Sequence, residues 1–284
     1  MLANYLIGLR EGLEAGLIVG ILFAYLRKLD RRDLAPKLWL GIGFAVLVSL
    51  GTGAILTWGP YGLSFQAQEL LGGGLSILAV VLVTWMIFWM AAHARSLKGE
   101  MQSKLDLAVA GSGVGIVILG IVSVGREGVE TALFVWATVA STGSAVSGTV
   151  AALLGILTAA GAAYLIFRGT LKINLGRFFT WTGGFLIIVA AGVLLYGIGD
   201  LQEAGLIPGL GQQAFSLAAA IPPSSWYGTL LQGLFNFTPE PTWQQFTAWL
   251  LYIVIVGAVF ISRAVIRPVA IRRAAIPAES HRTA

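Results

Sequence analysis

The sequence contains no cysteine and only two histidines among its 284 residues. Disulfides, thiolate metal sites, iron–sulfur clusters and cysteine nucleophiles are therefore excluded, and histidine metal chemistry is nearly excluded as well. Charged residues are also scarce, at 11% of the chain, whereas about 25% is usual in soluble globular proteins. A soluble domain with so few charges would lack a solvated face. The composition thus excludes disorder, a nucleic-acid-binding module and almost any cytosolic enzyme.

The chain is instead rich in hydrophobic residues, which make up 57% of it. A helix needs about 20 apolar residues to cross a lipid bilayer. Seven stretches reach that length, at residues 4–26, 38–58, 70–91, 111–138, 149–167, 181–199 and 246–266. The sequence therefore predicts an all-α membrane protein, with a single domain over residues 1–284 that contains seven transmembrane helices.

The basic residues indicate how these helices are oriented. Of the 18 Lys and Arg residues, all but Arg10 and Arg126 lie in alternate connections or in the tail, counted from Arg263 on. The other connections, around 59–69, 139–148 and 200–245, contain none. Because basic residues mark the cytoplasmic side of a membrane, we expect the N-terminus outside and the C-terminus in the cytoplasm.

An internal repeat relates the first three stretches to the next three. The motif REGLE at residues 10–14 recurs as REGVE at residues 126–130, in the first and fourth stretches. The pattern predicts two copies, about 1–92 and 108–200. An outer loop of about 200–245 follows, and then a seventh span with a basic tail, about 246–284. Three spans are an odd number, so the copies must be inverted, which places a binding site near the midplane where they meet.

The two motifs place charges where lipid does not tolerate them. Each charged residue at a helix centre costs about 2.5–3.5 kcal/mol, so six that were unpaired would cost on the order of 15–20 kcal/mol. They must pair, face a wet cavity, or both. Arginine at position i neighbours glutamate at i+4 on a helix, which predicts that Arg10 and Arg126 support the second glutamates of their motifs, Glu14 and Glu130.

The glutamates of each motif share one helix face, since they are three residues apart. Two antiparallel helices that cross in contact at Gly12 and Gly128 would present four carboxylates to one another. The first glutamate of each motif would then lie level with the second glutamate of the other. Converging carboxylates repel, a cation relieves the repulsion, and ligands that offer only oxygen select hard cations over copper(I) or zinc. A structural alternative is that each motif only forms ion pairs that hold the packed helices together.

The duplicated REGxE motif, on the first and fourth of seven spans, resembles the oxidase-linked iron permease family of fungi and bacteria. The resemblance extends over nearly the whole chain, including Thr84-Trp85-Met86 and the segment Trp249–Tyr252. It implies a transporter of the cytoplasmic membrane rather than an enzyme. Iron, imported as the ferric ion, would be its substrate and not a permanently bound cofactor. An extracytoplasmic iron-binding or oxidase partner is also implied. The iron ligands would be Glu11, Glu14, Glu127 and Glu130.

Three further acids stand near the predicted outer ends of spans. Asp200 and Glu203, at the end of the sixth stretch, resemble the outer acidic motif of the family, and Glu69 precedes the third stretch. They would gather the ion outside, or form a solvated rim. Relatives often carry another acid near the start of the third span, where this chain has Gly72.

Other functions fit the same residues. The protein could be a permease for ferrous iron or another hard divalent cation, a proton-coupled carrier of an organic cation, or a structural membrane subunit. The sequence does not fix the oxidation state of the iron. Four glutamates and two arginines sum to −2, which Fe²⁺ brings to 0 and Fe³⁺ to +1, and one proton more or less removes that difference. No G-x-x-x-x-G-K loop occurs, so ATP-driven pumping by this chain is excluded.

Overall fold

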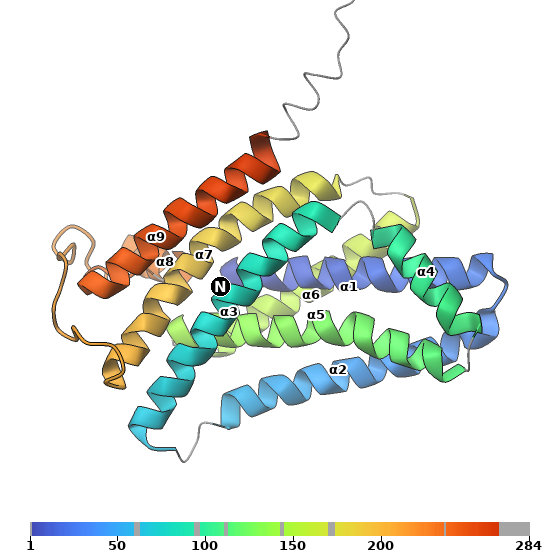
Figure 1. Cartoon of the computed structure of the whole chain (residues 1–284), viewed down its shortest axis with the longest axis horizontal. Helices are drawn as coiled ribbons and strands as arrows, with labels where there is room; N and C mark the ends of the chain where they lie inside the picture. Colours follow the sequence, from blue (N-terminus) through green and yellow to red (C-terminus); the bar gives the residue numbers. More distant parts are fainter. Residues whose placement is uncertain are drawn as a thin grey trace, which may run out of the picture.

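The structure, a computed structural model, describes residues 2–59, 63–93, 97–110, 113–142, 145–169, 174–235 and 237–266. Over these ranges the protein is a helix bundle (Figure 1), and its only β pairing is one isolated bridge between Gln213 and Thr242. The helices are α1 (Leu2–Lys28), η1 (Arg32–Leu34), α2 (Ala35–Trp58), α3 (Phe65–His93), α4 (Leu97–Ala110), α5 (Gly113–Thr142), α6 (Ala145–Phe167), α7 (Leu175–Glu203), α8 (Trp226–Phe235), α9 (Trp243–Phe260) and the π-helical turn η2 (Ile261–Ile266). The predicted basic tail, from residue 267 on, lies outside the described residues.

Each of the seven predicted stretches corresponds to a helix, in the order α1, α2, α3, α5, α6, α7 and α9. Two further α-helices lie in the connections between these stretches, where the hydropathy pattern predicted no span. In α4, Met101 and Leu105 are buried whereas Lys104 and Asp106 are exposed, so one face packs on the bundle and the other is solvated. Helix α8 has 10 residues, too few to cross a bilayer, and lies within the predicted outer loop.

Among the described residues, five helices are long and apolar enough to span a membrane, namely α2, α3, α6, α7 and α9. The helices α1 and α5 are also long, with 27 and 30 residues, but each carries the three charges of its motif. They lie side by side through the middle of the bundle, and α6 and α2 pack along them (Figure 1). The two long helices that carry charges in their middle are therefore the central ones.

Glycines bring the backbones of paired helices into direct contact. The most extensive packing joins α1 to α6, α2 to α5 and α3 to α7. A Cβ on Gly8 of α1 would overlap the carbonyl oxygen of Ala152 on α6, and a Cβ on Gly155 would overlap that of Tyr5. At the α2–α5 contact, a Cβ on Gly41 would overlap the carbonyl oxygen of Val117. Such close approach is how helices associate in lipid, where apolar contact alone provides little driving force.

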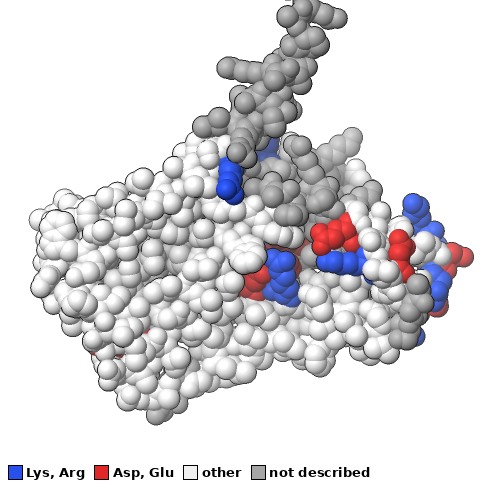
Figure 2. Space-filling model, viewed as in Figure 1, with Lys and Arg blue, Asp and Glu red and all other residues white. Residues whose placement is uncertain are grey.

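The surface is apolar over most of its area and charged at one end. Figure 2 shows Lys, Arg, Asp and Glu gathered where α1 ends and α2 begins, while the opposite end of this face is almost uncharged. One small patch of both signs lies in the middle of the face, over α5. Large hydrophobic side chains such as Leu47, Ile55 and Leu157 are about two-thirds exposed, as lipid-facing residues would be.

The α1–α6 contact provides a test of this packing. We expect Gly155→Ala to lower the thermal unfolding midpoint of the detergent-purified protein, because the added methyl group meets backbone and overpacking costs about 1–3 kcal/mol. The matched control is Gly161→Ala on the same helix, where no described atom lies within 4 Å of the new Cβ and alanine is the better helix former by about 1 kcal/mol. Equal midpoints for the two variants would contradict the close packing.

Candidate metal site

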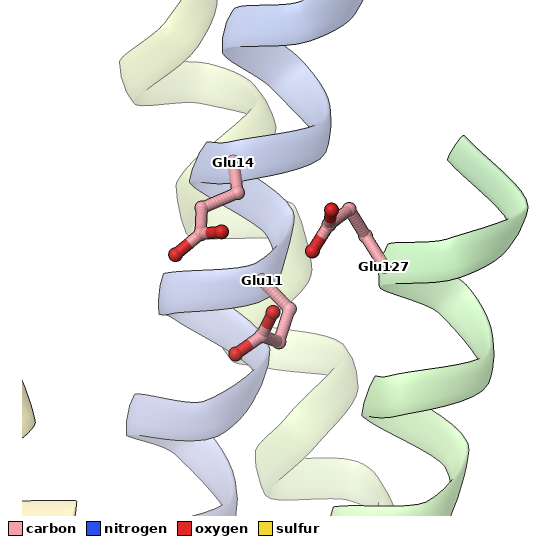
Figure 3. A group of neighbouring side chains, drawn as sticks. All are labelled: Glu11, Glu14 and Glu127. Carbon is pink, nitrogen blue, oxygen red and sulfur yellow. The ribbon is translucent and has the colours of Figure 1, made fainter. Parts of the chain in front are cut away.

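Three buried glutamates from the two central helices come together. Glu11 and Glu14 project from α1 and Glu127 from α5, and their exposed fractions are 1%, 4% and 5%. One carboxylate oxygen from each lies within 4.8 Å of the other two. In Figure 3, Glu127 reaches from α5 toward α1 at the height of Glu14, while Glu11 lies lower along α1. Carboxylates of both motifs thus converge within the reach of one metal ion.

The fourth glutamate of the two motifs is held at the edge of this group. Arg126 donates a 2.8 Å hydrogen bond from Nε to Oε1 of Glu130, and its Nε lies 4.0 Å from an oxygen of Glu127. The guanidinium also lies over the ring of Trp89 on α3, 4.8 Å from its centroid. The side chain of Arg126 is 44% exposed. Glu130 therefore sits with Arg126 on the side of the site that opens to the surface.

The other arginine, Arg10, is sealed in the bundle with a side chain only 1% exposed. Its Nε lies 3.3 Å from Oε1 of Glu14, and its guanidinium lies 5.9 Å from the ring centroid of Phe179 on α7. Both arginines are thus close to the glutamate four residues later, as the helical spacing predicts. Their surroundings differ, although the two motifs differ in sequence only at Leu13 and Val129.

Several buried polar atoms at this site find no hydrogen-bond partner within the described residues. They are both oxygens of Glu11, one oxygen each of Glu14, Glu127 and Glu130, and Nε and Nη1 of Arg10. An unsatisfied buried polar group costs about 1–3 kcal/mol, and more if it is charged. With Arg10 and three ionised glutamates, the buried group carries a charge of −2. A hard cation bound to these oxygens would satisfy them and reduce that charge.

The expected contact between Gly12 and Gly128 is wrong. A Cβ on Gly12 would lie 2.8 Å from the Cβ of Ala159 on α6, and a Cβ on Gly128 would overlap Ser49 of α2. Successive residues turn by about 100° around a helix, so a glycine next to a glutamate faces well away from it. The glycines of the motifs therefore allow α1 to pack closely on α6 and α5 to pack closely on α2. With these faces packed, the glutamates face each other between α1 and α5.

The outer acids form a separate group at the ends of α3 and α7. Asp200 is buried, Glu69 is half-buried and Glu203 is exposed. Glu69 and Glu203 lie close enough to Asp200 for their charges to repel its own. A Cβ on Gly72 would lie 2.8 Å from Oδ2 of Asp200, so the glycine makes room for this carboxylate.

Trp89 and Phe179 are residues of the site that sequence reasoning missed. Each lies over one motif arginine, but from α3 and α7 rather than from the helix of the motif. Nothing in their spacing along the chain relates them to the arginines, because the contact is made only when the helices pack. A cation over an aromatic face gains about 0.5–2 kcal/mol.

Comparisons with known proteins identify the family of the chain. The sequence matches the iron permease FTR1 family over residues 1–273. It is 33% identical over 257 residues to the ferrous iron permease EfeU of Escherichia coli O6:K15:H31, with 89% of this chain and 93% of the relative covered. The Yersinia pestis protein of the same name is 31% identical, with 89% and 91% covered. No solved structure matches the chain.

The unequal burial of the two arginines leads to a prediction. We expect Arg10→Lys to lower the thermal unfolding midpoint in detergent more than Arg126→Lys does. Lysine keeps the charge but lacks the planar fork that holds a carboxylate, and only at the sealed position is no water available to compensate. A larger loss of stability for Arg126→Lys would show that burial does not determine how much each arginine contributes to stability.

Proposed function

Because the chain belongs to the iron permease FTR1 family, we propose that it imports iron across the cytoplasmic membrane, through the site between α1 and α5. The observation that carries the proposal is the convergence of three buried carboxylates from two central helices. The similarity to iron permeases over 89% of the chain supports iron as the transported ion. Iron is then a substrate in transit, and the protein is a transporter and not an enzyme.

In this proposal α1 and α5 cross the membrane together with the five more apolar helices. Their lengths of 27 and 30 residues exceed the roughly 20 that a span requires. The charged end in Figure 2 contains the end of α1 and would face the cytoplasm, which puts the N-terminus outside. The helices α6 and α2 then separate the motif charges from lipid on one side of each central helix.

The packing also supports an inverted repeat of α1–α3 and α5–α7. Exchanging the two sets turns the α1–α6 contact into the α5–α2 contact and leaves the α3–α7 contact unchanged. The glycines of the two motifs follow the same symmetry. Gly12 of α1 contacts α6 at Ala159, and Gly128 of α5 contacts α2 at Ser49. A site at the interface of such repeats is the arrangement by which many transporters bind their substrates near the midplane.

The proposed path begins at the outer acids, Glu69, Asp200 and Glu203, which concentrate the cation near α3 and α7. An extracytoplasmic iron-binding or oxidase partner would deliver iron there. Between α1 and α5 the carboxylates replace the water around the ion, and Glu130 exchanges its bond with Arg126 for the metal. Movement of the repeats against each other then exposes the ion to the cytoplasm.

Two oxidation states of iron remain candidates. The resemblance of the sequence to oxidase-linked permeases predicts ferric iron. Ferrous iron is favoured by the charge of the two motifs, since four glutamates and two arginines sum to −2, which a divalent ion balances. Relatives from E. coli and Y. pestis are also named ferrous iron permeases.

The oxidation state is open to a direct test with purified protein in liposomes. We expect faster uptake of iron supplied as Fe²⁺ with a reductant than of Fe³⁺ delivered from a weak chelator, because a buried trivalent ion would leave one positive charge uncompensated. Faster uptake from the ferric complex would instead indicate that ferric iron is the substrate. Uptake of an organic cation without iron would support the proton-coupled carrier. No uptake at all would support the structural membrane subunit.

The ligands are tested by Glu→Gln variants, which keep side-chain size but remove the anionic ligand. We expect Glu11→Gln, Glu14→Gln and Glu127→Gln each to nearly abolish iron uptake. Glu130→Gln should lower it by roughly 10–100-fold, the range for groups that support a metal site from its edge. The control is Glu100→Gln, which breaks an exposed pair with Lys104 on α4. Normal iron uptake by any two of the first three variants would contradict the proposal that these carboxylates bind the ion.

A further inference from the structure

A small apolar cavity lies directly beyond the glutamates. It has a volume of about 20 Å³ and is lined by eleven residues of α1, α3, α5 and α7, among them Ile7, Val83, Phe134 and Leu186. Ile7 is one turn before Glu11 on α1, and Phe134 is one turn after Glu130 on α5. In the proposed orientation the cavity therefore lies between the glutamate site and the outside.

The chemistry of the cavity keeps it dry. About 10–15 Å³ is enough for one water molecule, but a buried water needs two to four polar partners. Among the lining residues only Thr138 is polar, and its hydroxyl already bonds to the carbonyl oxygen of Phe134 and to Asn4. A metal ion on this route would have to shed its water with nothing to replace it. An apolar constriction of this kind blocks ions by excluding water.

The opposite side of the glutamates is polar and reaches the surface. Arg126 and Glu130, whose side chains are 44% and 16% exposed, precede Phe134 on α5, and so lie on the cytoplasmic side of the cavity. A charged patch over α5 is visible in Figure 2. The site is thus closed by apolar residues on one side and opened by charged residues on the other.

We propose that the cavity is the closed outer gate of the transporter and that Phe134 is the side chain that holds it shut. The proposal rests on the proposed function and on the proposed orientation. Phe134 is the largest residue around the cavity, it is 2% exposed, and it stands on the same helix as Glu127 and Glu130. A shift of α5 that repositions the motif would therefore also move the gate.

The absence of cysteine from the chain provides a clean test. Ala79→Cys places one thiol in the cavity wall, where the added sulfur has room. In iron-free right-side-out vesicles, a membrane-impermeant cationic thiol reagent should label it slowly. Adding Phe134→Ala should speed labelling at least about tenfold, because loss of the ring favours the open, hydrated state. Phe134→Leu, which retains an apolar side chain, should label at nearly the original rate.

A matched control separates a gate from an ordinary core. Leu22→Ala removes a fully buried side chain from a separate buried cluster, formed by residues of α1, η1, α2, α4 and α5, none of which lines the cavity. It should destabilise the protein in detergent without speeding labelling at residue 79. Equal acceleration by Leu22→Ala, no acceleration by Phe134→Ala, or labelling only from the cytoplasmic side would overturn the proposal. Because labelling needs no iron, failed iron uptake would refute the proposed function separately.

Discussion

The repulsion among Glu11, Glu14 and Glu127, buried together in an apolar bundle, is the constraint on which the rest of the structure depends. Carboxylates in a low-dielectric interior repel strongly and lose their hydration. Arg10 compensates one charge, and a bound cation would compensate the others. The close packing of α1 on α6 and of α5 on α2 supplies the rigid support that such a group requires. Without that support the helices would separate and admit water.

The two motifs nearly repeat a sequence, yet they do not repeat an environment. Arg10 is sealed beneath Phe179, whereas Arg126 lies half-exposed beside Trp89. A bundle with exact twofold symmetry would open equally to both sides of the membrane. An alternating-access transporter must instead break that symmetry in each of its states. In the proposed transport cycle, the unequal burial of the two arginines would be this broken symmetry at the level of single side chains.

Sequence patterns predicted the long helices, because a run of 20 apolar residues has few alternatives in lipid. They also predicted the pairs of Arg10 with Glu14 and of Arg126 with Glu130, since both follow from spacing within one helix. The partners of Gly12 and Gly128 were predicted wrongly, because the faces on which neighbouring helices pack are set by tertiary structure. Helices α4 and α8 were missed because neither is apolar and long enough to read as a span.

The contact of Gly8 with Ala152 and of Gly155 with Tyr5 has a consequence for biosynthesis. Chains elongate at about 5–20 residues per second, so residues this far apart emerge on the order of 10–30 s apart. Throughout that interval α1 exists without the helix that it packs against, while Arg10, Glu11 and Glu14 are already made. As a span in the proposed topology, the nascent α1 would therefore depend on the insertion machinery, or on a water-filled path beside it, to hold its charges until α6 is made.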